Sequence, residues 1–99
     1  MLNFDWDSEK AKINFQKHGV SFEEAMTVFE DPEALLIADP EHSTEEDRFI
    51  LLGLSSSFRL IIVCHCYRKE ETIRLISARK ATKSERNQYN RHIGLDNYA

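Results

Sequence analysis

The segment that most constrains the fold of this 99-residue chain is residues 73–86, IRLISARKATKSER, where a strand pattern changes into a helix start. Thr82 with Glu85 three positions later is the capping-box pattern of a helix N-terminus. The segment holds one acid, Glu85, and five cations: Arg74, Arg79, Lys80, Lys83 and Arg86. A strand end that leads into a helix N-terminus and is surrounded by cations is a typical place for phosphate to bind.

Alternation of side chains assigns the faces of the last two strands. In the final strand we expect Ile73, Leu75 and Ser77 on one face and Arg74, Ile76 and Ala78 on the other, before a turn through residues 79–81. In the strand before it, residues 58–67, we expect a core face of Phe58, Leu60, Ile62, Cys64 and Cys66. The opposite, mixed face carries Arg59, Ile61, Val63, His65 and Tyr67, and it has the composition of a functional surface.

The remaining signals predict an α+β domain. Asp7 or Ser8 caps a helix that runs to about His18 and stops at Gly19, and Ser21 with Glu24 opens a second helix that ends before Pro32. Strands are expected over residues 2–6, 34–38, 48–54, 58–67 and 73–78, an acidic loop over 39–47, and a last helix over about 83–91. Short turns between successive strands favour an antiparallel sheet, with the helical hairpin packed on one face.

Composition and charge narrow the class of protein. The length suits one domain spanning residues 1–99, with no clear signal in the tail from about 92. The first residues are charged and apolar runs are short, so we expect a cytoplasmic chain with no signal peptide and no membrane span. Residues 1–47 hold 3 Lys and Arg against 13 Asp and Glu, whereas residues 48–99 hold 10 against 4. This asymmetry suits a nucleic-acid enzyme with one basic face, or two solvated surfaces of opposite sign.

The cationic residues have the chemistry that RNA cleavage without a metal requires. The ribose 2′-hydroxyl attacks the adjacent phosphorus, so the site must move protons and stabilise extra negative charge. We therefore predict two groups of site residues: Arg79, His65, Arg74 and Arg59 as catalytic, and Lys80, Lys83, Arg86 and Lys17 as RNA-binding. Structural alternatives remain open for several of them. Arg79 can pair with Glu85, Arg74 with a carboxylate, and His65 can be a core residue.

Other polar side chains carry weaker signals. Lys17 and His18 close the first helix, where cations also suit the helix dipole. His42 can anchor the acidic loop, whose carboxylates (Glu41, Glu45, Glu46 and Asp47) suit a solvated surface better than a Mg²⁺ site. In Cys64-His65-Cys66, alternation places the imidazole opposite the two thiols, so the three cannot share one metal ion. We expect both cysteines in the core, no bound metal and no cofactor.

Several separated motifs closely resemble the BrnT family of toxins from bacterial type II toxin–antitoxin pairs, in the RelE/ParE superfamily. The resemblance covers about Phe4 to Tyr89. It is carried by Trp6-Asp7 with Lys10 and Asn14, residues 17–25 (KHGVSFEEA), Val28-Phe29, Asp31-Pro32, Asp39-Pro40, His42-Ser43, residues 47–50 and 53–55, and residues 73–82 (IRLISARKAT) with Glu85, Arg86 and Tyr89.

The resemblance implies a RelE-like fold and a metal-independent ribonuclease that cleaves mRNA and stops translation. It implies a BrnA-like antitoxin with a ribbon-helix-helix part, which covers the active surface and brings the complex to operator DNA, in a two-plus-two heterotetramer. Functional roles carry over first to Arg79, then to Arg59, His65, Arg74, Glu85 and Arg86. The alternatives are a ParE-like toxin that inhibits a protein target, and an inactive subunit that only binds its antitoxin.

Overall fold

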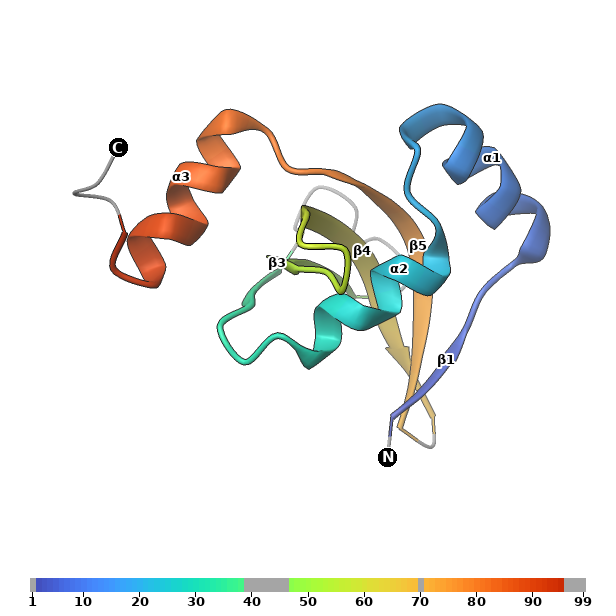
Figure 1. Ribbon diagram of the computed structural model, residues 1–99. Coiled ribbons are helices and arrows are strands. Elements are labelled where there is room, and N and C mark those ends of the chain that lie inside the picture. Colours follow the sequence, from blue (N-terminus) through green and yellow to red (C-terminus); the bar gives the residue numbers. More distant parts are fainter. Residues whose placement is uncertain (1, 39–46, 70, 96–99) are drawn as a thin grey trace.

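The computed structural model describes residues 2–38, 47–69 and 71–95 (Figure 1). Within them the elements are β1 (Asn3–Asp5), α1 (Ser8–His18), α2 (Phe22–Thr27), the 3₁₀ helix η1 (Val28–Glu30), β2 (Leu35–Ala38), β3 (Arg48–Leu54), β4 (Leu60–Arg68), β5 (Thr72–Lys80) and α3 (Lys83–His92). The predicted order of strands and helices is confirmed. Of the predicted acidic loop, Asp47 is described and exposed, whereas Glu41, His42, Glu45 and Glu46 lie outside the described residues.

The strands form one sheet in the order β1-β5-β4-β3-β2. The chain from β2 to β5 makes antiparallel pairs, as predicted. β1 runs parallel to β5, with Asn3 opposite Thr72 and Asp5 opposite Arg74, so the prediction of a wholly antiparallel sheet is wrong. The reason is that β1 and β5 are distant in sequence, and no short turn fixes the direction in which they meet.

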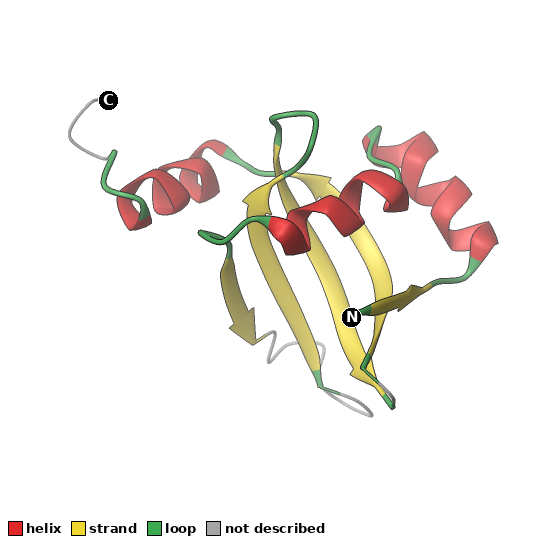
Figure 2. Cartoon of the chain, turned by 60° about the horizontal axis from the view of Figure 1, so that its bottom comes forward, coloured by secondary structure: helices red, strands yellow, loops and turns green. Residues whose placement is uncertain are grey.

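The two faces of the sheet bury separate apolar clusters. α2 lies over one face, α1 lies beside β5 at the edge of the sheet, and α3 lies to one side, beyond the end of β5 (Figures 1 and 2). The larger cluster lies under α2 and includes Phe22, Ala25, Ile61, Val63 and Leu75. The smaller cluster joins α3 to the opposite face through Leu52, Ile62, Ala81 and Tyr89. β4 is therefore buried on both faces, including the mixed face with Ile61, Val63 and His65 that was interpreted as a functional surface.

A β-bulge reverses the side-chain alternation within β5. His65 lies opposite Leu75, but its neighbour Cys64 lies opposite Ser77, so Ile76 is an extra residue in β5. Beyond such a residue every side chain changes face. Ala78 accordingly joins the cluster under α2 instead of sharing the face of Arg74 as predicted. Arg79 is turned to the face that carries Arg74, which simple alternation does not allow.

The predicted helix caps form with one difference. Asp7 accepts hydrogen bonds from the backbone N–H groups of Glu9 and Lys10, and Gly19 ends α1 with a φ of 70°, a conformation that glycine adopts freely. Thr82 and Glu85 make the complete capping box of α3. Ser21 accepts from the N–H of Glu24. The Glu24 carboxylate instead binds Ser55 and Arg59, because β4 brings a cation beside it.

A hydrogen-bonded aspartate holds α3 against the rest of the molecule. The Oδ2 atom of Asp31 accepts from the hydroxyl of Tyr89, 2.7 Å away, and from the N–H of Leu54, 2.8 Å away. The pKa of Tyr89 is raised to about 12, first by burial and then by its bond to this carboxylate. Gly53 makes the close approach possible, since a Cβ there would lie 2.9 Å from the Cβ of Ala34 and 3.1 Å from Asp31. None of the described helices is long and apolar enough to cross a membrane.

Candidate functional site

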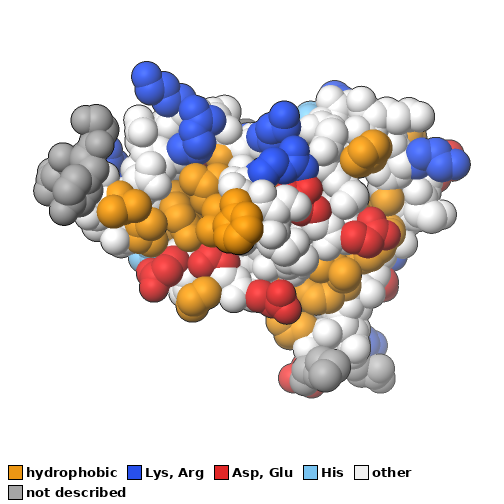
Figure 3. Space-filling view, in the orientation of Figure 1, with side chains coloured by type: hydrophobic (Ala, Val, Ile, Leu, Met, Phe, Trp, Pro, Cys, Tyr) orange, Lys and Arg blue, Asp and Glu red, His pale blue; other side chains and the backbone are white. Residues whose placement is uncertain are grey.

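Five of the predicted site residues gather where β4 begins and β5 ends: Arg59, Arg79, Lys80, Lys83 and Arg86. We call this set the cationic end of the sheet. Ile61 lies opposite Lys80, and the N–H of Ala81 donates to the carbonyl of Leu60 at 3.0 Å, so the two strand ends lie side by side. α3 begins immediately afterwards. Figure 3 shows Lys and Arg side chains along one margin of the molecule, next to hydrophobic side chains on the same face.

Arg79 is held by a bidentate bond to Glu85. Its Nη1 and Nη2 atoms donate to Oε1 and Oε2 of the carboxylate at 2.8 and 2.9 Å, and Nη1 also donates to the carbonyl of Lys80 at 3.3 Å. The pairing that the sequence left open as an alternative is therefore present. These bonds leave an Nε and an Nη2 proton of the guanidinium unused, and the side chain is 40% exposed. Arg79 can bind a phosphate oxygen while Glu85 fixes its plane.

The same bonds make Glu85 strongly acidic. The hydrogen bond from Arg79 is the largest cause, and with the N–H of Thr82 it lowers the pKa of the Glu85 carboxyl from 4.5 to about 2. Because the folded pKa is depressed, the stabilisation is complete above about pH 4.5. It is lost as the pH falls toward 2.

We expect Glu85→Gln to reduce the free energy of unfolding by about 1–3 kcal/mol at pH 7, since the amide keeps the size of the side chain but loses its charge. The difference from the wild-type chain should shrink progressively below pH 4.5. Urea unfolding at pH 7, 5 and 3.5 measures it. Glu9→Gln, which removes an exposed carboxylate from the first turn of α1, is the matched control. If Glu85→Gln lowered the free energy of unfolding by the same amount at all three pH values, the result would contradict the lowered pKa of Glu85.

Arg59, just before β4, is hydrogen-bonded to α2 and to the residue that ends α1. Its Nε atom donates to Oε2 of Glu24 at 3.0 Å, its Nη2 atom bonds Oε1 of the same carboxylate, and Nη2 also donates to the carbonyl of Gly19 at 3.1 Å. The hydroxyl of Ser55 donates to Glu24 at 2.7 Å. The Arg59 hydrogen bond lowers the pKa of Glu24 and raises the pKa of Arg59 itself. The guanidinium thus fixes the turn between β3 and β4 to the start of α2.

That turn carries Phe58 in an unusual position. The residue was predicted on the core face of β4, but β4 begins at Leu60 and the Phe58 side chain is 84% exposed, so the prediction is wrong. Its φ is 61°. A bulky residue in this left-handed region is a true outlier, and such strain costs on the order of 1–3 kcal/mol.

The other predicted cations differ in their distance from Arg79 and in their own contacts. Arg74 pairs with Asp5 at 3.3 Å and lies five positions earlier on β5, roughly 16 Å away along the strand. Lys17 is exposed in the last turn of α1. Within the cationic end, Lys80 and Lys83 are exposed, and Nη1 of Arg86 donates to the carbonyl of Ala81 at 3.1 Å.

His65 does not lie on the surface. Its side chain is 0% exposed, packed edge-on against Phe29 at 4.9 Å between ring centroids and against Tyr67 at 5.2 Å. Nδ1 lies 3.2 Å from the carbonyl of Val63, and Nε2 lies 3.3 Å from the hydroxyl of Tyr67. Burial lowers the pKa of the imidazole, so the neutral form is favoured at pH 7. The structure therefore does not bring His65 together with Arg79.

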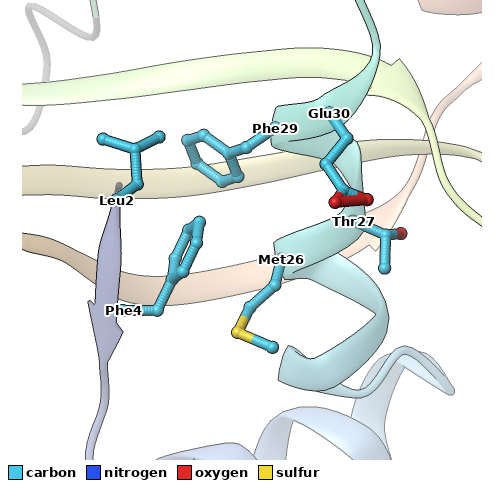
Figure 4. A pocket seen from close by; sticks show the side chains of 6 residues that line it. All are labelled: Leu2, Phe4, Met26, Thr27, Phe29 and Glu30. Atoms are coloured by element: carbon cyan, nitrogen blue, oxygen red, sulfur yellow. The ribbon is translucent and has the colours of Figure 1, made fainter.

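The described residues also bear on metal binding. No group of three or more His, Cys, Asp or Glu side chains in the described ranges could hold a metal ion. Cys66 is buried and Cys64 partly buried, both as reduced thiols. A separate apolar hollow of about 360 Å³ lies between β1 and α2, lined by Leu2, Phe4, Met26, Thr27, Phe29 and Glu30. In Figure 4 Phe29 points toward Leu2 and Phe4, whereas the Glu30 carboxylate lies on the other side of Phe29.

Two structural roles at the site were missed from sequence. Asn14 was identified only as a residue of the family resemblance, yet it is buried and bonds the backbone of Ala78 next to Arg79. Glu24 was identified only as a capping residue, although it binds Arg59. For Asn14 the neighbouring apolar residues, Ile13 and Phe15, are exposed and give no signal of its burial. For Glu24 the partner is 35 residues away and no local pattern indicates it.

Comparisons with known proteins agree on one family. The family described as "Ribonuclease toxin, BrnT, of type II toxin-antitoxin system" matches residues 6–85. A similar solved structure is the crystal structure of the Brucella abortus ribonuclease toxin BrnT, with 25% sequence identity and a TM-score of 0.63. The match covers 84% of this chain and 100% of that chain. No curated protein matches significantly. Because the family match spans most of the sequence and includes the strand end that carries Arg79, the chain belongs to the BrnT family of ribonuclease toxins of type II toxin–antitoxin systems.

Proposed function

We propose that this chain is a metal-independent endoribonuclease that cuts RNA at the cationic end of the sheet and thereby stops translation. The observation that carries the proposal is the Arg79 guanidinium, fixed in plane by Glu85 yet partly exposed beside Lys80 and the first turn of α3. A guanidinium held in this way is preorganised for the extra negative charge of a phosphorane-like transition state, so it costs little reorganisation when the reaction occurs.

In the proposed reaction the ribose 2′-hydroxyl gives its proton to water and attacks the adjacent phosphorus, and the 5′-oxygen of the next nucleotide leaves and takes up a proton from water. The products are a 2′,3′-cyclic phosphate and a 5′-hydroxyl end. Arg79 would bind a non-bridging oxygen through its unused Nε and Nη2 protons. Lys80, Lys83 and Arg86, with Lys17 at the end of α1, would bind neighbouring phosphates. Such contacts make RNA binding strongly salt-dependent.

The contacts of the other predicted catalytic residues support different roles. Arg59 is occupied by Glu24 and the carbonyl of Gly19, which supports a role in positioning the turn before β4. Arg74 pairs with Asp5 at the other end of β5, which supports a role in holding β1. The complete burial of His65 supports a packing role in place of proton transfer.

We further infer that a BrnA-like antitoxin with a ribbon-helix-helix part neutralises the toxin in the cytoplasm. Membership of a type II toxin–antitoxin family supports a protein antitoxin. The exposed cations suit a partner segment that carries carboxylates. We propose a two-plus-two heterotetramer that reaches operator DNA through the antitoxin alone, and we assign the fold to the RelE-like class of the RelE/ParE superfamily because helices cover one face of a largely antiparallel sheet.

Incubation of the purified toxin with total RNA tests the proposal. We expect cleavage that persists in excess EDTA, with 2′,3′-cyclic phosphate ends on the products. An oligonucleotide in which every ribose is 2′-O-methylated should stay intact, because its blocked oxygen cannot attack. Loss of cleavage in EDTA that added Mg²⁺ restores would contradict the metal-independent mechanism. Growth arrest with intact RNA would favour a ParE-like protein target, and no arrest at all would favour an inactive antitoxin-binding subunit.

A further inference from the structure

The turn between β3 and β4 presents Phe58 in a manner that packing does not explain. The N–H of Phe58 donates to the carbonyl of Ser55 at 2.9 Å, and the N–H of Ser55 donates to the carbonyl of Arg59 at 2.9 Å. This is a tight hairpin turn followed by a residue in the left-handed conformation, a position that glycine normally occupies. Here the position holds a phenylalanine with a φ of 61° whose ring is almost wholly exposed.

The turn is firmly held, so the exposure of Phe58 does not result from a loose loop. The N–H of Ser56 donates to Oγ1 of Thr27 at 2.9 Å, and the N–H of Ser57 donates to Oγ of Ser55 at 3.2 Å. The hydroxyl of Ser55 is in turn bonded to Glu24. A partly buried polar network thus fixes the backbone that carries a strained, solvent-exposed aromatic ring.

The surroundings of Phe58 indicate what it binds. Phe58 precedes Arg59 and lies two residues before Leu60. The carbonyl of Leu60 accepts a hydrogen bond from the N–H of Ala81, which lies between Lys80 and Lys83 in the sequence. The ring therefore lies beside the cationic end, and its exposed neighbours Ser56 and Ser57 are polar. Figure 3 shows hydrophobic side chains next to Lys and Arg side chains on one face. Sites for single-stranded nucleic acid combine exposed aromatic rings with cations in this way, because the bases stack while the cations bind phosphate.

We propose that Phe58 is a stacking platform for an unpaired RNA base whose phosphates lie on the cationic end. The platform selects single-stranded substrate, since a base inside a duplex cannot reach the ring. This inference rests on the proposed ribonuclease function and names the form of RNA that the site accepts.

The test compares three substitutions in the purified toxin, with fluorescein-labelled, fully 2′-O-methylated single-stranded RNA as a probe that resists cleavage. We expect Phe58→Leu to bind roughly 10-fold or more weakly, since stacking on an aromatic ring is lost while an apolar side chain remains. Phe58→Trp should bind at least as well as the wild-type chain. Phe58→Gly should bind as weakly as Phe58→Leu but melt at the same or a higher temperature, because glycine adopts a φ of about 61° without strain.

Two controls separate stacking from general effects. Tyr67→Leu removes an exposed aromatic ring beside Arg68 at the far end of β4, and it should leave RNA affinity unchanged. A probe of the same length without bases should bind the wild-type chain and Phe58→Leu equally, because it offers phosphates but nothing to stack.

The outcomes that overturn the inference are distinct from failure of the proposed function. Equal RNA affinity of Phe58→Leu and a wild-type chain that binds and cleaves RNA would overturn the stacking role alone. An equal loss of affinity of Phe58→Leu for the base-free probe would also overturn it. So would a Phe58→Leu variant that loses antitoxin binding but keeps RNA binding, because Phe58 would then be a contact for the antitoxin. A wild-type chain that neither binds nor cleaves RNA would overturn both.

Discussion

Asn14→Ala is expected to destabilise the protein by about 3–5 kcal/mol, a large part of the 5–15 kcal/mol that stabilises a typical domain. Asn14 is 6% exposed. Its Nδ2 atom donates to the carbonyls of Val20 and Ala78 at 3.0 and 2.9 Å, and its Oδ1 atom accepts from the N–H of Ala78 at 3.0 Å. The substitution leaves these backbone groups buried without their partners, and each such group costs about 1–3 kcal/mol.

The size of this effect follows from the short length of β1. β1 pairs with β5 only from Thr72 to Arg74, so β1 offers no backbone partner to Ala78. The Asn14 carboxamide, which has the donor and acceptor of a peptide group, bonds both backbone atoms of Ala78 as a neighbouring strand would. It also joins α1 to the strand end that presents Arg79, so the loss should reduce RNA cleavage together with stability.

Urea unfolding followed by the fluorescence of Trp6, the single tryptophan, measures the loss. Trp6 packs edge-on against Phe22, 5.8 Å away between ring centroids, and therefore reports on the core. Asn87→Ala, at an exposed position on α3, is the matched control and should change stability by about 0.5 kcal/mol or less. If the urea concentration at the unfolding midpoint of Asn14→Ala were close to that of the control, the buried amide of Asn14 would not be needed for stability.

Elements with contiguous signals could be predicted from the sequence. Asp7, Ser21 and Thr82 each cap the helix that follows, because a cap and the N–H groups it bonds lie within three residues of each other. The strands from β2 to β5 pair in sequence order through short connections, which restricts their direction. These short-range signals do not indicate the partner of β1, because that partner, β5, is the last strand in the sequence.

The bulge in β5 shows why side-chain faces were harder to predict than strands. Nothing in Leu75-Ile76-Ser77 marks an inserted residue, since no glycine or proline stands there. One extra residue nevertheless moves Ala78 into the core and turns Arg79 to the face of Arg74. Alternation divided the faces of β4 correctly, but both faces are buried and His65 lies in the core, so neither face is an open surface. Periodicity identifies strands, but it does not show whether one face or both faces of a strand are buried.

The candidate site illustrates the same limit. Arg79 could be identified because a strand end, a capping box and a cluster of cations coincide within a few residues. Its bond to Glu85 could be anticipated as well, since the two residues are close in sequence. The roles of Arg59 and Arg74 depend on Glu24 and Asp5, which lie 35 and 69 positions away in the chain. Only the fold brings these carboxylates to them.

Arg79→Ala is expected to reduce RNA cleavage about 10²–10³-fold, the usual effect of removing one preorganised donor from an oxyanion site. Arg79→Lys should recover part of the rate, because the ammonium keeps the charge but not the planar fork that meets two oxygens. Both variants should stay folded. The pair with Glu85 is partly exposed, so its loss should cost no more than the roughly 1–3 kcal/mol expected for Glu85→Gln, and Thr82 still caps α3 in the absence of the guanidinium.

Single-turnover cleavage of a fluorogenic RNA measures the rates, and thermal melting confirms that each variant is folded. Lys69→Ala is the matched control, since it removes one positive charge from the hairpin after β4, at the opposite end of the sheet from Arg79. A general effect of net charge would lower the rate equally in Arg79→Ala and Lys69→Ala. Cleavage by Arg79→Ala within about 2-fold of the control would place the reaction elsewhere, because no preorganised donor is that dispensable.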